Sequence, residues 1–230
     1  MIHGAIFDFD GTLFDSMGVW QALPKRYLEA QGVHPPDNVF DEIRSMTFPQ
    51  AAEYFIREYA LPKDVHQVLQ ETSAIIMEMY AREVMPKPGV QELLDCLADH
   101  GVSMCIATAT DRPMIEAALK RCGLDHYFSA IFTCTEVQKS KTDPEIYELA
   151  RRHLGTVKSE TLVAEDALHA AKTAKEAGFV LLGVSDPSEP GQKELRRISD
   201  LYAERLDLPC VMEQVKELLQ RPDFSLPPDG

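Results

Sequence analysis

Two aspartates near the start of the chain have residue types and a spacing suited to metal-assisted chemistry. Asp8 and Asp10 follow the apolar residues Ile6 and Phe7 and precede Gly11. Side chains two residues apart in an extended segment point to the same side, so the two carboxylates repel each other unless a cation lies between them. Oxygen ligands of this kind suit Mg²⁺, and one carboxylate of such a pair can act as a nucleophile. We therefore interpret the pair as a metal-binding acid pair at a strand end, although Asp and Gly are also frequent in plain turns.

The elements that must position this pair follow from the pattern of the rest of the chain. From residue 90 onward, helical patterns alternate with short apolar runs, and such alternation is typical of βαβ units with a parallel sheet. We predict an α/β fold whose core is a Rossmann-like parallel sheet flanked by helices. Its strands are expected at residues 2–7, 102–107, 130–133, 161–164 and 179–184.

Residues 16–85 show a different sequence pattern, with helical periodicity and no strand candidate. They interrupt the α/β pattern after its first strand and predict an inserted α-helical cap domain, which can open and close over a site. Residues 85–89, rich in Pro and Gly, are interpreted as a linker. The expected division is a catalytic core at 1–15 and 86–222, a cap at 16–85 and a tail at 223–230.

Three further strand ends carry residues that could complete a site, because ligands of open α/β sheets bind beyond the carboxyl ends of the strands. Thr108 offers a hydroxyl, Lys141 a cation, and Glu165 and Asp166 a second acid pair. Each also has a purely structural interpretation. Thr108 could cap the following helix, and so could the second acid pair.

Taken together and in this order, the motifs resemble those of the haloacid-dehalogenase-like superfamily of phosphohydrolases over nearly the whole chain. The helical insert resembles the type-1 cap of phosphoglycolate phosphatase-like and β-phosphoglucomutase-like members. The residues that carry the resemblance are Asp8-Phe9-Asp10-Gly11-Thr12, Thr108, Lys141-Thr142-Asp143-Pro144 and Glu165-Asp166.

The resemblance implies a role for each catalytic residue. Asp8 would attack phosphorus and form an aspartyl-phosphate. Asp10 would protonate the leaving group and later take a proton from the attacking water. Thr108, the backbone amide of Ala109 and Lys141 would bind the phosphoryl oxygens.

The resemblance also implies a Mg²⁺ site. Its ligands would be Asp8, Asp166 and the backbone carbonyl of Asp10, with Glu165 as a further candidate.

These residues favour some reactions over others. Asp10 favours phosphoryl transfer over carbon–halogen cleavage, because dehalogenase members lack an acid at this position. A sugar-phosphate mutase is the main alternative; Arg44 and Arg57 could bind a second phosphate, but Pro49 lies where a mutase arginine is expected. A metal-dependent glycosyltransferase would leave the later motifs unexplained, and a non-catalytic metal-binding module would fit better if acidic residues were missing.

The expected substrate is a small phosphorylated metabolite. Aromatic and basic residues of the cap are candidates for specificity, though aromatic residues can equally pack the cap's own core. The candidates are Trp20, Tyr27, Arg44, Phe48 and Tyr54.

Composition narrows the possible partners and compartments. The chain has 230 residues and a net charge of −14, which disfavours binding to nucleic acid and to anionic membranes. Its five cysteines show no metal-binding spacing and are expected to be free thiols, and no signal-like or membrane-spanning stretch is evident. We predict a cytoplasmic protein that is a monomer or a weak homodimer.

Overall fold

The structure, a computed structural model, describes residues 1–44 and 46–220. It divides into two compact units. One combines Met1–Asp15 with the chain from Met85 onward, and the other comprises Ser16–Val84. The tail predicted at 223–230 lies outside the described residues.

The first unit is built on a six-stranded sheet in the order β5-β4-β1-β6-β7-β8. Every neighbouring pair of strands is parallel. The predicted α/β fold with a parallel sheet is therefore confirmed. The strands, in chain order, are β1 (Gly4–Phe7), β4 (Ser103–Thr108), β5 (Phe128–Thr133), β6 (Thr161–Glu165), β7 (Val180–Val184) and β8 (Leu201–Ala203).

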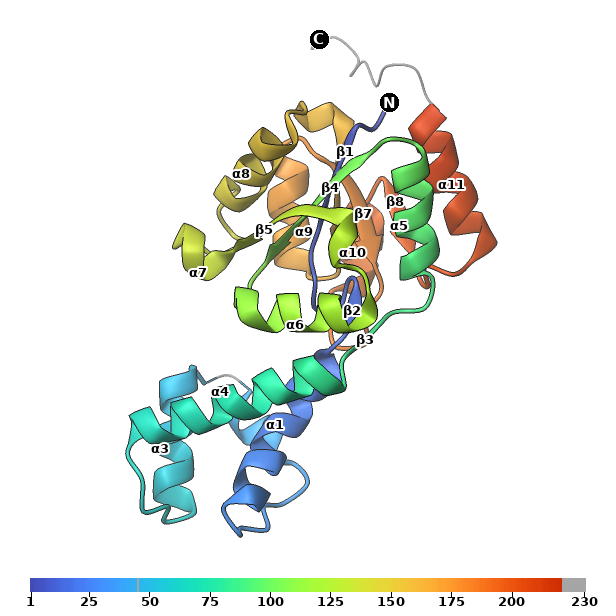
Figure 1. Cartoon of the computed structure of the whole chain (residues 1–230). Coiled ribbons are helices and arrows are strands. Elements are labelled where there is room, and N and C mark those ends of the chain that lie inside the picture. Colours follow the sequence, from blue (N-terminus) through green and yellow to red (C-terminus); the bar gives the residue numbers. More distant parts are fainter. Residues whose placement is uncertain (45, 221–230) are drawn as a thin grey trace. The chain divides into compact units, whose positions relative to one another are not determined.

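Helices cover both faces of this sheet (Figure 1). On one face, Ile6, Cys105 and Val163 from adjacent strands pack beneath α8 and α9 in a fully buried cluster. This face carries α8 (Glu145–Leu154), α9 (Leu168–Glu176) and α10 (Gln192–Ile198). The other carries α5 (Val90–Asp99), α6 (Arg112–Cys122) and α11 (Pro209–Gln220).

Several short elements were not predicted. Residues 85–86, interpreted as part of a linker, instead form strand β3 (Met85–Pro86), which pairs antiparallel with β2 (Phe14–Asp15). Strand β8 and helix α10 were also missed. Elements this short show no usable periodicity, and in α10 only Leu195 is buried. The remaining short elements are α7 (Cys134–Val137) and the 3₁₀ turns Asp125–Tyr127 and Lys158–Glu160.

The second unit consists of helices in the part of it that the structure describes. Helices α3 and α4 both begin with capping boxes, formed by Thr47 with Gln50 and by Asp64 with Gln67. Tyr27, Phe55 and neighbouring apolar side chains form its core. Its helices are α1 (Met17–Ala30), α2 (Val39–Ile43), α3 (Phe48–Glu58) and α4 (Val65–Arg82).

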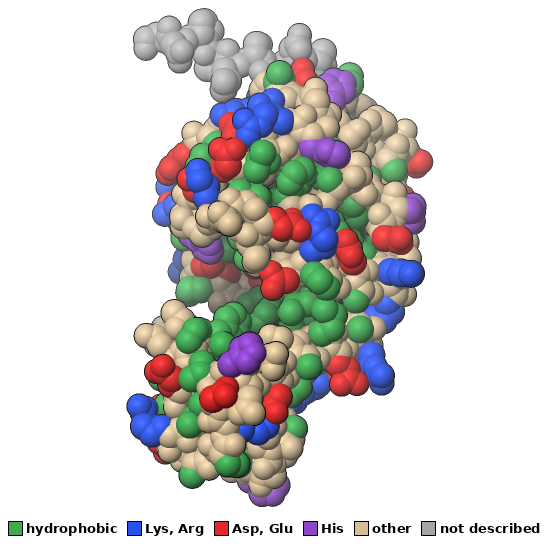
Figure 2. All heavy atoms as spheres, turned by 60° about the vertical axis from the view of Figure 1, so that its left-hand side comes forward, with side chains coloured by type: hydrophobic (Ala, Val, Ile, Leu, Met, Phe, Trp, Pro, Cys, Tyr) green, Lys and Arg blue, Asp and Glu red, His purple; other side chains and the backbone are tan. Residues whose placement is uncertain are grey.

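Two features of the molecule bear on its partners. Across the described residues, no helix combines the length and the apolar character that crossing a bilayer requires. On the face shown in Figure 2, basic side chains are interspersed with acidic ones.

Candidate active site

Asp8 lies at the centre of the α/β unit's sheet, directly after β1. Its backbone amide donates to the carbonyl of Ala164 on β6 at 3.0 Å, so the backbone is still held by the sheet where the side chain emerges. The chain then turns back on itself, because the amides of Leu13 and Phe14 both donate to the carbonyl of Phe9. The rings of Phe9 and Phe14 stack at 4.2 Å beneath this turn. A buried, rigid backbone therefore fixes the direction of the Asp8 carboxylate.

Gly11 brings this turn into contact with the second acid pair. Its φ of 76° lies in the left-handed region, and a Cβ at this position would lie 2.2 Å from Oδ2 of Asp166. The neighbouring Thr12 donates from Oγ1 to Oδ1 of the same carboxylate at 3.2 Å. The first motif thus both carries Asp8 and orients Asp166, which follows a strand more than 150 residues later.

Lys141 is the cation of the cluster. It is 6% exposed and pairs with the carboxylates of Asp8 and Glu165, the latter at 2.7 Å. The hydroxyl of Tyr147 donates to the same Glu165 oxygen at 2.7 Å. The alternative lysine of this loop, Lys139, is exposed and pairs with Asp143.

The carboxylates of Asp8, Glu165 and Asp166 form a group that could hold a metal ion. Each offers an oxygen within 4.8 Å of the others, and all three side chains are buried. Among the described residues, Oε2 of Glu165 is buried with no hydrogen-bond partner. A buried oxygen without a donor, in a group of three carboxylates facing one lysine, fits a divalent cation with oxygen ligands.

The pKa values in this cluster reflect the same excess of negative charge. Burial, followed by the charges of Asp8 and Glu165, raises the pKa of Asp166 to about 9. Burial also raises the pKa of Glu165 to about 7, although Lys141 opposes this shift. Burial would lower the pKa of Lys141, but its two carboxylate partners outweigh that effect and raise it. Without a metal, the cluster therefore holds protons that a cation would displace.

The end of β4 carries two hydroxyls, and one of them, that of Thr110, contacts Asp10. Thr108 is fully buried, and its Oγ1 accepts a hydrogen bond from the amide of Thr110 at 3.1 Å. Thr110 in turn donates from Oγ1 to Oδ2 of Asp10 at 2.6 Å. Ala109, between them, is exposed at the end of the strand. Sequence reasoning did not select Thr110; the only signal was a second hydroxyl two residues after Thr108.

Thr108 and the second acid pair do not cap the helices that follow them. The N-cap of α6 is Asp111 rather than Thr108. The first amide of α9, that of Leu168, donates a hydrogen bond to the carboxylate of Glu189 at 3.2 Å rather than to the second acid pair. Glu165 and Asp166 instead belong to the carboxylate cluster, and the Thr108 hydroxyl accepts from the amide of Thr110.

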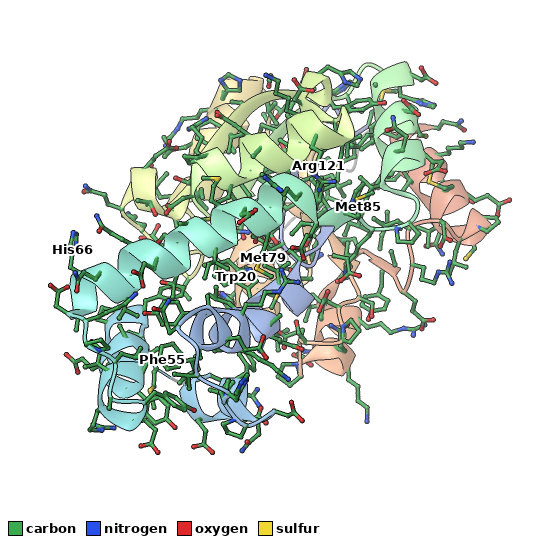
Figure 3. The ribbon with its side chains drawn as sticks, turned by 60° about the horizontal axis from the view of Figure 1, so that its bottom comes forward. Trp20, Phe55, His66, Met79, Met85 and Arg121 are labelled. Carbon is green, nitrogen blue, oxygen red and sulfur yellow. The ribbon has the colours of Figure 1, made fainter. Side chains whose placement is uncertain are left out.

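The residues expected to set specificity fall into different places within the helical unit. Trp20, Arg44 and Phe48 line one cavity of about 180 Å³, together with Phe55 and other apolar side chains. Figure 3 shows Trp20 and Phe55 among the helices of this unit. The indole nitrogen of Trp20 donates to the hydroxyl of Tyr80 at 3.1 Å.

The other two candidates are not on this cavity. Tyr27 is fully buried in the core of the unit, and its hydroxyl donates to Glu71 at 3.3 Å. Tyr54 packs edge-to-face against Phe55 and Tyr59.

The sequence profile of the haloacid dehalogenase-like hydrolases matches residues 5–184, a span that contains every strand-end motif described above. The chain belongs to this family. The predicted family resemblance is thus confirmed.

Relatives in the family carry several activities. A Bacillus subtilis (strain 168) protein assigned as the phosphatase YhcW is 28% identical over 182 residues, which cover 78% of this chain and 81% of the relative. The Escherichia coli (strain K12) fructose-1-phosphate phosphatase YqaB is 26% identical over 178 residues, covering 76% and 93%. A (S)-2-haloacid dehalogenase of Pseudomonas sp. (strain CBS-3) is 27% identical over 194 residues, covering 80% and 84%.

Solved structures share the fold. A crystal structure of a Thermotoga maritima protein assigned as a β-phosphoglucomutase has a TM-score of 0.83 at 22% identity, and the match covers 94% of this chain and 99% of that protein. At this level of identity the likeness concerns the fold alone.

Proposed function

We propose that this protein is a Mg²⁺-dependent phosphatase that hydrolyses a small phosphorylated metabolite through an aspartyl-phosphate on Asp8. The enzyme class, a phosphoric monoester hydrolase, is supported by the family and by relatives named as phosphatases. The observation that carries the mechanism is the convergence of Asp8, Glu165 and Asp166, at the carboxyl ends of the adjacent strands β1 and β6, with Lys141 from the loop between α7 and α8.

Asp8 is the proposed nucleophile. Lys141 pairs with its carboxylate and would remain beside it to bind the oxygens of the incoming phosphoryl group. The buried surroundings strengthen this charge interaction, since little water competes with it. Attack would form a bond between a carboxylate oxygen and phosphorus while the bond to the ester oxygen breaks.

Asp10 is the proposed general acid and base. Its contact with Thr110 holds the carboxylate at the end of the strand that neighbours β1. There it would protonate the departing ester oxygen and later remove a proton from the water that hydrolyses the aspartyl-phosphate.

Thr108 and the amide of Ala109 would bind the phosphoryl oxygens at the end of β4. Bound Mg²⁺ would be held by Asp8, Asp166 and the carbonyl of Asp10, with Glu165 close by, and would stabilise negative charge on the transferring group. Such combined stabilisation is needed, because enzymes accelerate phosphate-monoester hydrolysis by up to ~10²¹-fold.

The competing reactions are less well supported. A dehalogenase relative is known, but the Thr110–Asp10 contact gives this chain an oriented acid beside the nucleophile, which suits a poor alkoxide leaving group. A mutase would require a second phosphate site. Arg44 instead lies on a cavity whose other walls are mostly apolar.

The proposal extends to partners and compartment. The substrate is a small organic phosphate, with no role for nucleic acid or membrane, and the chain acts as a monomer or weak homodimer. All five cysteines are unpaired, which supports a reducing, cytoplasmic environment.

The test is phosphatase activity on a generic aryl phosphate with Mg²⁺, with EDTA, and with Asp8→Asn. Asp207→Asn, an exposed aspartate paired with Arg205, is the matched control. We expect turnover in the unsubstituted protein and the control that is lost with EDTA and in Asp8→Asn. Turnover that persists in Asp8→Asn would refute the aspartyl-phosphate.

A further inference from the structure

Tyr147 places a buried hydroxyl beside Lys141, the proposed catalytic lysine. The proposed mechanism gives this hydroxyl no role. It lies on α8, six residues after Lys141, and its side chain is fully buried. Its ring belongs to the apolar cluster beneath α8 and packs against Phe179 with ring centroids 6.2 Å apart. A tyrosine in such a cluster needs a partner for its hydroxyl, and here the partner is Glu165.

The two oxygens of Glu165 are used differently. Oε1 accepts hydrogen bonds from both the Tyr147 hydroxyl and the Lys141 ammonium, each at 2.7 Å. Oε2 is buried and has no hydrogen-bond partner in the described part of the chain. Two donors on one oxygen, coming from two different side chains, fix the plane of the carboxylate.

We propose that Tyr147 is a positioning residue for the divalent-cation site. It holds Glu165 so that Oε1 faces Lys141, while Oε2 is left to the cation, directly or through a bound water. This inference rests on the metal site of the proposed function.

Glu165 needs such a positioning residue because the final torsion of a glutamate side chain is weakly restrained. Rotation about the final bond of a glutamate side chain is broad and nearly two-fold. With Lys141 as the only donor left, either oxygen of Glu165 could turn toward the lysine, and the site would no longer be preorganised. Loss of a hydrogen-bond partner behind a metal-site residue typically costs about 10- to 100-fold in metal affinity.

The experiment measures Mn²⁺ binding to the full-length protein without substrate, by isothermal titration. Tyr147→Phe removes the hydroxyl and keeps the ring in its cluster. We expect its Kd for Mn²⁺ to rise about 10-fold. Tyr147→Met, which fills the same space with a flexible apolar side chain, is expected to show a similar rise. Tyr202→Phe, which removes a hydroxyl that donates to Gln192, is the control and should bind like the unsubstituted protein.

A double-mutant cycle distinguishes positioning from general loosening of the core. If Tyr147 acts through Glu165, Tyr147→Phe should weaken Mn²⁺ binding little or not at all once Glu165→Gln is present. An equal weakening in both backgrounds would overturn the inference, and so would unchanged binding by Tyr147→Phe. If the unsubstituted protein itself bound no Mn²⁺, the proposed metal site would fail first and the inference with it.

Kinetics supply a second readout. The Mg²⁺ concentration that gives half-maximal turnover should rise in Tyr147→Phe by the same factor as the Mn²⁺ Kd, and high Mg²⁺ should restore much of the rate. A loss of rate that Mg²⁺ does not restore, with unchanged metal affinity, would contradict a positioning role.

Discussion

The strand-end site of the α/β unit is made of buried charged side chains, whereas the cavity of the helical unit is lined mainly by apolar ones. In the first, four ionisable side chains are each less than a tenth exposed: Asp8, Lys141, Glu165 and Asp166. In the second, the interior is lined mainly by apolar and aromatic side chains, and a charged pair such as Arg26 with Glu83 is exposed.

From this difference we propose that the strand-end site performs the chemistry. Buried charges are costly and persist where a structure holds them together for a purpose. Burying apolar side chains around a cavity costs less free energy than burying charges, and a single substitution can change the shape of the cavity. Such cavities therefore suit recognition of the variable part of a substrate. The predictions below test this division, beginning with the largest expected effect.

Asp8→Asn should remove nearly all turnover. An amide in place of the carboxylate is a far poorer nucleophile, and we expect a loss of roughly 10⁴-fold or more in the single-turnover rate. Turnover reduced by less than about 100-fold would mean that another group performs the chemistry.

Lys141→Met should destabilise the metal-free protein strongly. It leaves two buried carboxylates, those of Asp8 and Glu165, without their cation, and breaking a buried pair in this way costs about 3–5 kcal/mol of unfolding free energy. Urea unfolding with EDTA and with Mg²⁺ would measure the loss and its partial recovery by the metal.

The matched substitution in the helical unit is Arg26→Met. Its ion pair with Glu83 is more than two-fifths exposed on both sides, so we expect a loss of less than about 1 kcal/mol. Equal losses for the two substitutions would contradict the contrast between the two regions.

The stability of the metal-free protein should depend on pH through Glu165 and Asp166. Their pKa values in the folded protein, about 7 and about 9, lie above the ordinary values of 4.5 and 3.8. Between the ordinary and the raised values the folded state therefore binds more protons than the unfolded state. These groups lower the free energy of unfolding as the pH rises from about 4 to about 9.

A divalent cation should counter this loss. The difference in Tm between samples with Mg²⁺ and with EDTA is expected to be larger at pH 8 than at pH 5. A difference that does not change with pH would show that these carboxylates do not share a cation.

Phe48→Ala should have the smallest effect on stability and a selective effect on substrate use. The side chain is 59% exposed, so the unfolding free energy should change by less than about 0.5 kcal/mol. If the cavity contacts the organic part of the substrate, KM should rise by a factor of about 3 to 10, as expected for lost apolar contact, with kcat nearly unchanged. Val157→Ala, an exposed apolar residue of the α/β unit, is the control and should leave KM unchanged.

The sequence was most informative where the same few residues determine both the backbone conformation and the side chains of the site. A short apolar run that ends in an acid pair and a glycine predicts both the strand and the position of its carboxylates, and Gly11 lies where a Cβ would collide with Asp166. The alternation of helical patterns with short apolar runs predicts the parallel sheet, and the structure confirms it. The roles of the individual site residues remain predictions for the experiments above.

The contacts that sequence reasoning missed join residues far apart in the chain. Thr110 reaches Asp10 across 100 residues, and Tyr147 reaches Glu165 across 18. Neither contact leaves a periodic signal. The aromatic residues of the cap were similarly ambiguous, because Trp20 on the cavity and Tyr27 in the core have the same kind of helical spacing.

The most direct test of the central claim is chemical trapping of the phosphorylated residue. The protein would be mixed with an aryl phosphate and Mg²⁺, quenched in denaturant, reduced with borohydride and analysed by peptide mass spectrometry. An aspartyl-phosphate on Asp8 predicts homoserine at position 8 and none in Asp8→Asn. Rapid turnover with an unmodified Asp8, or trapping at Asp10 or Asp166 instead, would contradict the account.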